Sequence, residues 1–459
     1  MSAAEAGAGR LGAPGSGAVG IGGGPGTGSR RVLYLHQHYS GPGGATATRS
    51  HAMAAALAAR GHRVTLACGR YEGAATGLSG PFRNGRRSGR VGGFTVVEFD
   101  IPCGNNQRLR ARGLSFARFA ARAAALAMRD EWDVVLASST PLTVAVPALL
   151  ARWRRGTPFV FEIRDPWPEL PRALLAGRAS GASRLPASWA LAGMERLAGA
   201  ACREAAAVIG LTEGMADTAL ARGADPARVH VVPNGCDLDL FGPQVAPWRP
   251  PGVAPWECLA VYAGAHGRAN GLDLLLDAAA ALRARGEGRV RILLVGDGGE
   301  KPRLRAAAAQ RGLDNLGFLD PLPKTELAAL LAGSQVVLHC LADVPEFAEW
   351  TAPNKLMDGL AAGRPVVSNV PGRAARLLEA APAGAAPSGI AVPPADPDAL
   401  AAALAFLAAD PARREAMGRA ARAQAVARWD RRLQARRLCE VVEAAVFPAP
   451  RPTLAMVPA

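Results

Sequence analysis

Short apolar runs that alternate with helical segments along most of the chain constrain its fold more than any other feature. Runs typical of buried strands lie at 32–37, 62–68, 133–137, 158–162, 207–211, 229–232, 258–264, 290–295 and 335–339. Segments with helical periodicity follow many of them. Alternation of this kind is typical of parallel sheets covered by helices on both faces. The sequence therefore predicts an α/β protein built from doubly wound, Rossmann-like units.

The length of the chain and one proline-rich stretch indicate two domains. With 459 residues, the chain is too long for a single hydrophobic core. Residues 242–257 are rich in proline and lack periodicity, as a linker does. The Gly-rich N-terminal stretch cannot offset the entropy of ordering. We expect a disordered tail at 1–29, domains at 30–241 and 258–426, a last helix at 427–446 and a loose tail at 447–459.

Cysteine usage and hydropathy point to a cytoplasmic protein. The seven cysteines are scattered and form no CxxC pair, so we expect buried free thiols. Glycine occupies the place where a signal peptide would have its apolar core. No run approaches the ~20 uninterrupted apolar residues of a membrane-spanning helix.

The formal net charge of +15 comes almost entirely from arginine, and lysine occurs only at positions 301, 324 and 355. This composition is typical of GC-rich coding, and we expect no nucleic-acid partner. Arginine is densest in residues 83–122, which also contain Phe116 and Phe119. This segment is either a solvated, loosely ordered excursion or a basic aromatic face that rests on anionic lipid.

Residues 351–367, TAPNKLMDGLAAGRPVV, are predicted to form a phosphate-facing loop, a short helix and a buried strand. Pro353 suits a first helical turn, and Asn354 can cap free backbone N–H groups there. Those amides favour an anion, and Lys355 adds a cation beside them. Asp358 lies one turn further along. The stretch therefore suits a nucleotide diphosphate.

Glycine-rich turns follow three of the predicted strands. The turn at 41–44 opens a helix predicted from about residue 45 to 60, which completes half a Rossmann unit. Dinucleotide binding is not expected, because the strand at 62–68 ends in Cys-Gly-Arg rather than in an acid. Gly264 and the stretch 296–299 follow two strands of the second domain, where backbone N–H groups could meet phosphate or sugar.

Acidic residues follow two other strands. Glu162, Arg164 and Asp165 lie at the carboxyl end of a buried strand, where parallel sheets place ligands, although they could equally pair on the surface. Asp165 is the best candidate among them for a contact with a ligand. Asp237-Leu238-Asp239 matches a DxD pattern that can hold a divalent metal, but it leads from Pro-Asn-Gly into the linker. We interpret it as turn chemistry and predict no metal site.

The stretch 351–367 resembles the donor-site signature of family-4 glycosyltransferases. Further matches to the family follow in order at 34–37 with 43–44, 161–169, 232–235, 262–264 with 271–273, and 294–298. Together they span about residues 31–445. Their order and spacing are specific for the family and are closest to its bacterial members that build surface polysaccharides.

This resemblance implies the GT-B fold, in which two Rossmann-like domains face a cleft and the last helix crosses back to the first domain. It also implies a retaining transfer of a hexosyl or N-acetylhexosaminyl group. The expected donor is a nucleotide diphosphate sugar, with UDP as the nucleotide, and the acceptor a cell-envelope glycan or lipid-linked precursor. No cofactor or metal is expected. An anionic membrane surface is a further candidate partner, reached from the inner face of the plasma membrane.

The resemblance assigns roles to individual residues. Catalysis falls to Asp165, Lys355 and Arg268; donor binding to Gly264, Asp297, Phe318, Leu319, Asn354, Lys355, Leu356 and Asp358; and acceptor binding to Gly43, Gly44, Arg49, Glu162 and Arg164. Two positions depart from the family pattern. Asn270 occupies a position near the one where the family pattern has a lysine. Asp358 replaces the more frequent glutamate, which would bind the ribose hydroxyls.

Two other functions fit the same sequence. A nucleotide-sugar epimerase on the same plan would consume its substrate without an acceptor. A non-catalytic partner protein would bind UDP without turnover. The intact stretch 353–358 favours an enzyme over the second of these.

Overall fold

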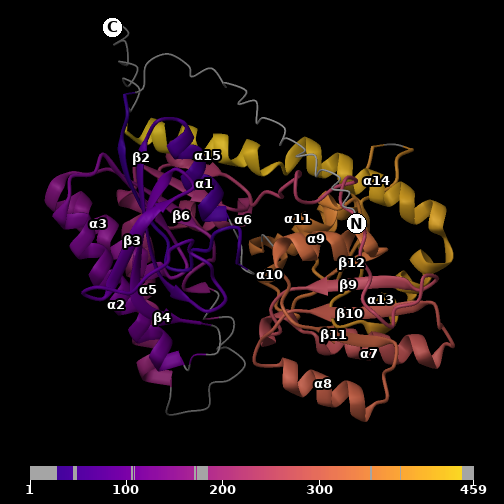
Figure 1. Cartoon of the computed structure of the whole chain (residues 1–459). Coiled ribbons are helices and arrows are strands. Elements are labelled where there is room, and N and C mark those ends of the chain that lie inside the picture. The colour runs from indigo at the N-terminus through magenta and orange to yellow at the C-terminus, as the bar shows by residue number, and fades with distance from the viewer. Residues whose placement is uncertain are drawn as a thin grey trace, which may run out of the picture.

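The computed structural model describes residues 28–44, 49–104, 107, 109–169, 172, 184–351, 354–382 and 384–446. Most of both predicted tails, the predicted helix start at 45–48, and Pro353 lie outside the described residues. Figure 1 shows two α/β domains side by side, and both are doubly wound as predicted.

The first domain is built on an eight-stranded sheet with the order β3-β4-β2-β1-β5-β6-β7-β8. All of its neighbouring strands are parallel except β3, which is antiparallel to β4. The strands are β1 (Arg31–Leu35), β2 (Arg63–Tyr71), β3 (Arg86–Val91), β4 (Phe94–Cys103), β5 (Val134–Ser138), β6 (Phe159–Ile163), β7 (Ala207–Gly210) and β8 (Val229–Val231). The helices are α1 (Arg49–Ala59), α2 (Leu109–Arg129), α3 (Ala145–Arg155), α5 (Arg184–Glu204) and α6 (Glu213–Ala221).

The second domain has a fully parallel six-stranded sheet with the order β11-β10-β9-β12-β13-β14. Its strands are β9 (Cys258–Ala263), β10 (Val290–Val295), β11 (Leu316–Leu319), β12 (Val336–His339), β13 (Val366–Ser368) and β14 (Gly389–Ala391). Its helices are α7 (Asp273–Ala284), α8 (Lys301–Gln310), α9 (Lys324–Gly333), α10 (Phe347–Trp350), α11 (Asn354–Ala361), α12 (Arg373–Glu379), α13 (Pro397–Ala409) and α14 (Pro411–Arg428).

Apolar side chains fill both faces of each sheet, which explains why the strands read as nearly continuous hydrophobic runs. On β1, for example, Leu33 and Leu35 contact one core cluster while Val32 and Tyr34 contact another. All seven cysteines are buried and free, as predicted. Among the described residues, no helix is long and apolar enough to cross a membrane.

The last helix, α15 (Arg431–Val446), lies against the first domain (Figure 1). Leu438 and Val442 are at most 1% exposed and belong to the same core cluster as Met53 and Leu57 of α1. The chain leaves and re-enters the first domain at adjacent points. The backbone N–H of Cys236 donates to the Trp429 carbonyl at 2.7 Å, and that of Arg431 donates to the Cys236 carbonyl at 2.9 Å.

The structure overturns the prediction of a loosely ordered excursion at residues 83–122, and it removes Phe116 and Phe119 from the alternative, a basic face that rests on lipid. The segment contains the β3–β4 hairpin and most of α2, so it is not loosely ordered. Phe116 is 9% exposed and Phe119 is fully buried, so neither ring is available to lipid. Their burial anchors α2 to the domain core, whereas Arg118 and Arg122 of the same helix remain exposed.

The proline-rich connection between the domains packs on the second domain. The N–H of Trp248 donates to the Ala329 carbonyl at 2.9 Å, and Arg249 donates to the Gly333 carbonyl at 3.0 Å. A Cβ on Gly333 would lie only 2.1 Å from the Trp248 carbonyl oxygen, so this close approach requires glycine.

Candidate active site

A cavity of about 520 Å³ lies between the domains. The second domain contributes the loops after β9 and β10 and the first turns of α9 and α11, and the first domain contributes residues 71–73 after β2. Its wall includes five residues that the resemblance assigned to donor binding, namely Gly264, Asp297, Asn354, Lys355 and Asp358.

Two glycines allow the loops after β9 and β10 to pack against each other. Gly296 has φ of 143° and Gly298 has φ of 154°, conformations that other residues rarely adopt. A Cβ on Gly296 would lie 1.9 Å from the Gly264 carbonyl oxygen, and one on Gly298 would lie 2.5 Å from that of His266. These glycines therefore bring the two loops together at the cavity wall.

Lys355 presents an ammonium group held only by neutral partners. Its Nζ donates to Tyr262 Oη and to Asn270 Oδ1, both at 2.8 Å, and lies 4.4 Å from the Tyr262 ring centroid. Burial lowers the pKa of Lys355 to about 8. Across the described residues, no carboxylate forms an ion pair with it. Asn270, the departure from the family pattern, thus orients Lys355 without neutralising it.

Asp358 has a cationic partner that the sequence did not predict. The Nζ of Lys324 donates to Asp358 Oδ2 at 2.5 Å, and the two side chains are 16% and 5% exposed. Both residues line the cavity. The rarity of lysine in this chain was the available signal for Lys324, but nothing in the sequence pairs α9 with α11.

Lys301, the third lysine, has a structural position. Its Nζ donates to the carbonyls of Gly296 at 2.7 Å and Leu319 at 3.0 Å, and to Asp320 at 2.6 Å. It therefore fixes the ends of β10 and β11. The predicted donor contacts Phe318 and Leu319 do not line the cavity, because Phe318 packs against the core and the Leu319 carbonyl already accepts from Lys301.

Two other predicted residues lie away from the cavity wall. The side chain of Arg268 is 69% exposed and pairs with Glu300 at 3.1 Å. The turn that contains Arg268 directs Asn270 toward Lys355 instead. Leu356 is 1% exposed and belongs to the hydrophobic core beneath α11. In this structure neither residue lines the cavity, and their predicted roles stay predictions.

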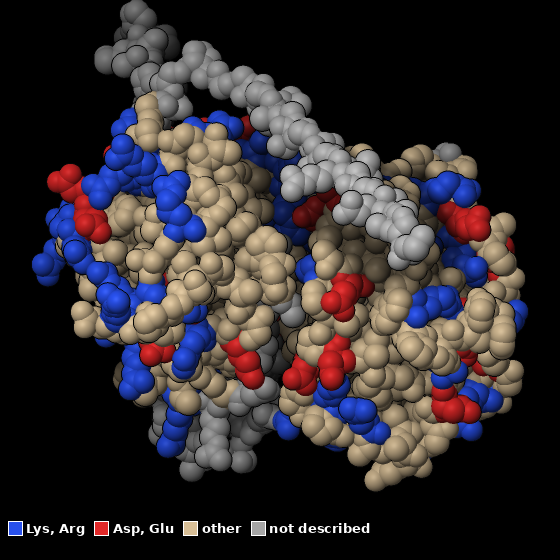
Figure 2. Space-filling model, in the orientation of Figure 1, with Lys and Arg blue, Asp and Glu red and all other residues tan. Residues whose placement is uncertain are grey.

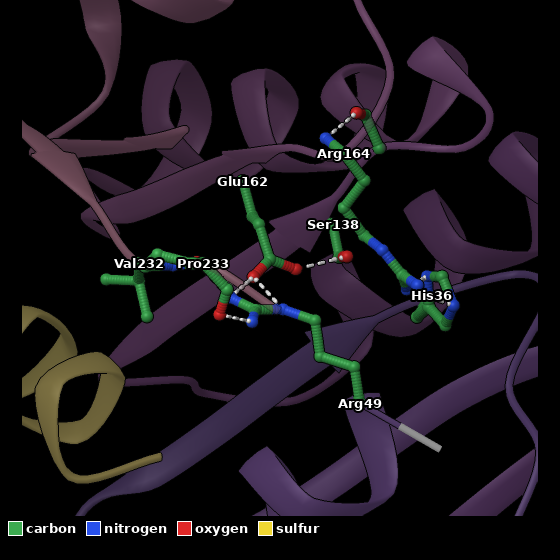
Figure 3. Close-up of polar contacts among 8 residues, drawn as sticks. His36, Arg49, Ser138, Glu162, Arg164, Val232 and Pro233 are labelled. Atoms are coloured by element: carbon green, nitrogen blue, oxygen red, sulfur yellow. Dashed lines mark hydrogen bonds and ion pairs between the residues drawn. The ribbon is translucent and has the colours of Figure 1, made fainter. Parts of the chain in front are cut away.

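Arg49 and Glu162, predicted to bind the acceptor, form a completely buried ion pair in the first domain (Figure 3). The guanidinium contacts Glu162 Oε1 at 2.8 and 3.1 Å and donates to the carbonyls of Val232 and Pro233. Ser138 donates to the other carboxylate oxygen at 2.5 Å. Burial raises the pKa of Glu162, but Arg49, Arg164 and Ser138 lower it below its ordinary value. Both side chains are 0% exposed, so they position the ends of β5, β6 and β8 and do not reach a ligand.

Arg164 and Asp165 remain half-buried at the end of β6 but do not line the cavity. Arg164 donates to His36 Nε2 at 2.7 Å (Figure 3), and Thr140 donates to Asp165. Burial and the nearby Arg164 lower the pKa of His36 well below its ordinary value, so the ring is neutral and accepts this hydrogen bond. Among the described residues, no carboxylate forms an ion pair with Arg164.

Of the two predicted turn glycines, Gly43 is exposed and Gly44 is buried. A Cβ on Gly44 would lie 2.1 Å from Ser40 Oγ and 2.9 Å from the Ala75 nitrogen. The turn thus packs against the loop that carries Gly73 to the cavity wall.

The DxD stretch forms a turn. Asp237 Oδ1 accepts a hydrogen bond from the Leu240 N–H at 3.2 Å, and exposed Asp239 pairs with Arg432 at 3.2 Å.

Comparison with known proteins identifies both halves of the chain. Residues 44–235 match the family model of the glycosyl transferase 4-like domain, and residues 257–410 match that of the glycosyl transferases group 1. The D-inositol 3-phosphate glycosyltransferase of Kribbella flavida is 35% identical over 210 residues, which cover 43% of this chain and 47% of that protein. The protein of the same name from Segniliparus rotundus is 33% identical over 210 residues, 44% of each chain. The matched region thus spans about half the length of these relatives.

Solved structures share the fold at low sequence identity. Sucrose-phosphate synthase from Thermosynechococcus elongatus has a TM-score of 0.69 at 17% identity, over 92% of this chain and 100% of that one. HepE from Anabaena, solved with UDP-glucose, has a TM-score of 0.60 at 19% identity, over 90% and 100%. With both domains matched in sequence and fold, the chain belongs to the family-4 glycosyltransferases and has the GT-B fold.

Proposed function

We propose that the protein transfers a sugar, with retention of anomeric configuration, from a UDP-sugar donor bound in the cavity between the domains. The observation that carries this proposal is the ammonium of Lys355, held by neutral partners at the start of α11. A half-buried cation at the start of a helix suits a diphosphate. HepE, a structural neighbour, was solved with UDP-glucose.

Catalysis would depend mainly on charge and position. As the bond between the anomeric carbon and the diphosphate breaks, negative charge grows on the leaving oxygen, and Lys355 is placed to stabilise it. Preorganised contacts of this kind can supply a large share of a rate enhancement. Asp165 would contact the acceptor hydroxyl. No metal takes part in this proposal.

The proposed acceptor carries a phosphate or another anionic group, as a lipid-linked or cell-envelope precursor does. Arg164 supports this, because its charge is held by a neutral imidazole rather than by a carboxylate. Relatives of this chain are named for inositol 3-phosphate. Arg112, half-buried over the Phe116 ring, adds a second cation nearby and contributes to lowering the pKa of His38 to about 3.

We further propose that the protein is cytoplasmic and that its first domain rests on an anionic membrane. Residues 30–241 contain 27 arginines and 16 acidic residues, whereas residues 258–446 contain 23 basic and 20 acidic ones. Figure 2 shows basic side chains predominating on the visible face of the first domain. The neighbouring helices α2 and α3 carry arginine and no acid, and Trp153 of α3 is 60% exposed. Basic residues with an exposed aromatic suit a lipid surface.

A thermal-shift screen of nucleotides and nucleotide sugars tests the donor proposal. A ligand at 100 times its Kd should stabilise the protein by about 2.7 kcal/mol. Stabilisation by UDP but by no other nucleoside diphosphate is the expected result, and no response to any nucleotide would contradict it. Turnover with a panel of phosphorylated acceptors then separates the transferase from the alternatives. An epimerase would consume donor without acceptor, and a non-catalytic protein would bind UDP without turnover.

A further inference from the structure

Lys324 occupies a position that its own helix does not favour. It is the first residue of α9, where the helix macrodipole destabilises a positive charge. Its ammonium nevertheless lies in the cavity wall, 2.5 Å from Asp358 Oδ2 and 5.5 Å from the ring centroid of Phe241. Groups outside α9 therefore hold it in place.

The two lysines of the cavity differ in what they offer a ligand. Lys355 has neutral partners, so its charge is available to a diphosphate. The charge of Lys324 is offset by Asp358, and the pair presents a hydrogen-bond donor and an acceptor side by side. A hydroxyl group both donates and accepts, whereas a carboxylate alone can only accept. The pair therefore matches a sugar hydroxyl better than it matches a phosphate.

We propose that Lys324 determines specificity for the sugar of the nucleotide, by donating to a ribose hydroxyl that in turn donates to Asp358. The proposal rests on the donor site described above. Asp358 is one methylene shorter than the glutamate more frequent in the family, and the longer side chain of Lys324 compensates for that lost reach. Ribose does not change during transfer, so Lys324 should act on donor binding and not on the chemical step.

Calorimetric titration with UDP, 2′-deoxy-UDP and 3′-deoxy-UDP tests this role. In Lys324→Met, the Kd for UDP should rise about tenfold, since hydrogen bonds to charged groups contribute about that much. The substitution should weaken the binding of at least one deoxy analogue less than that of UDP. The ratio of the Kd for that analogue to the Kd for UDP should therefore fall toward one. The matched control is Glu326→Gln, which removes an exposed charge from the same turn of α9 and should leave all three constants unchanged.

An equal rise in Kd for UDP and both deoxy analogues would overturn the proposal, because Lys324 would then act on the phosphates or only hold α9. If Lys324→Met does not fold, the same ratio of Kd values can be measured in Lys324→Arg, which retains the charge. The altered geometry of arginine should also reduce this ratio. A wild-type protein that binds no nucleotide would remove the donor site itself. UDP binding with an unchanged ratio in the variants would remove the role of Lys324 alone.

Discussion

Replacing Lys355 by alanine should lower kcat far more than it raises the KM for the donor. The lysine lies at the start of α11 with its Nζ 2.8 Å from two neutral oxygens, so its charge is stabilised only weakly before the donor binds. As the sugar departs, the diphosphate gains negative charge and this contact strengthens. An interaction made mainly in the transition state appears in kcat.

The magnitude follows from the cost of holding this charge. Burial lowers the pKa of Lys355 from 10.5 to about 8, which corresponds to on the order of 3 kcal/mol in favour of the neutral amine. A leaving group that restores the ordinary pKa recovers that energy. We therefore expect kcat to fall by roughly 10² to 10³, as for other single preorganised contacts.

The assay is UDP release from a saturating donor with an acceptor found in the phosphorylated panel. Asp358→Asn is the matched comparison, because it changes a neighbouring residue on the same helix that is proposed to bind the ribose. It should raise the donor KM and leave kcat within about twofold. Wild-type kinetics in Lys355→Ala would refute the assignment of the cavity to the donor, and a rise in KM alone would refute the argument that its charge acts in the transition state.

Three further perturbations probe the same structure. Unliganded Lys355 loses its proton above pH 8, so UDP binding there must take up a proton. The Kd for UDP should therefore rise up to about tenfold per pH unit between pH 8 and 10. A Kd that does not change with pH in calorimetric titrations would exclude Lys355 as the diphosphate contact. Glu162→Gln should leave the buried Arg49 charge without its counterion and lower the free energy of unfolding by about 3–5 kcal/mol in urea titrations. Replacing both residues with methionine should lower it less. An equal decrease in both variants would argue against a penalty for an unpaired buried charge. Turnover should persist in EDTA, and its loss with rescue by Mn²⁺ would return Asp237 and Asp239 to consideration as metal ligands.

Sequence patterns located most strands of both sheets, although not β11 or β14, because burial on two faces leaves long apolar runs. They missed the hairpin of β3 and β4, because β3 contains three arginines and alternates between exposed and half-buried positions. Five of the residues predicted to bind the donor line one cavity for the same topological reason, because strand ends and helix starts meet there. The sequence could not show that a three-residue turn directs Asn270 toward Lys355 and pairs Arg268 with Glu300. The partnership of Lys324 with Asp358 could not be predicted, since it depends on how two helices sit against one sheet.

Because α15 returns to the first domain, the domain that is synthesised first is the last to have a complete hydrophobic core. Ribosomes synthesise residues 31–235 first, yet Leu438 and Val442, which fill the core beside Met53 and Leu57, emerge last. Until then the nascent first domain exposes an apolar groove along α1. All strands of the second domain are synthesised before α15, so this domain can complete its hydrophobic core first. Premature termination of translation a few codons before α15 would therefore leave the first domain without part of its hydrophobic core, although that domain was synthesised first.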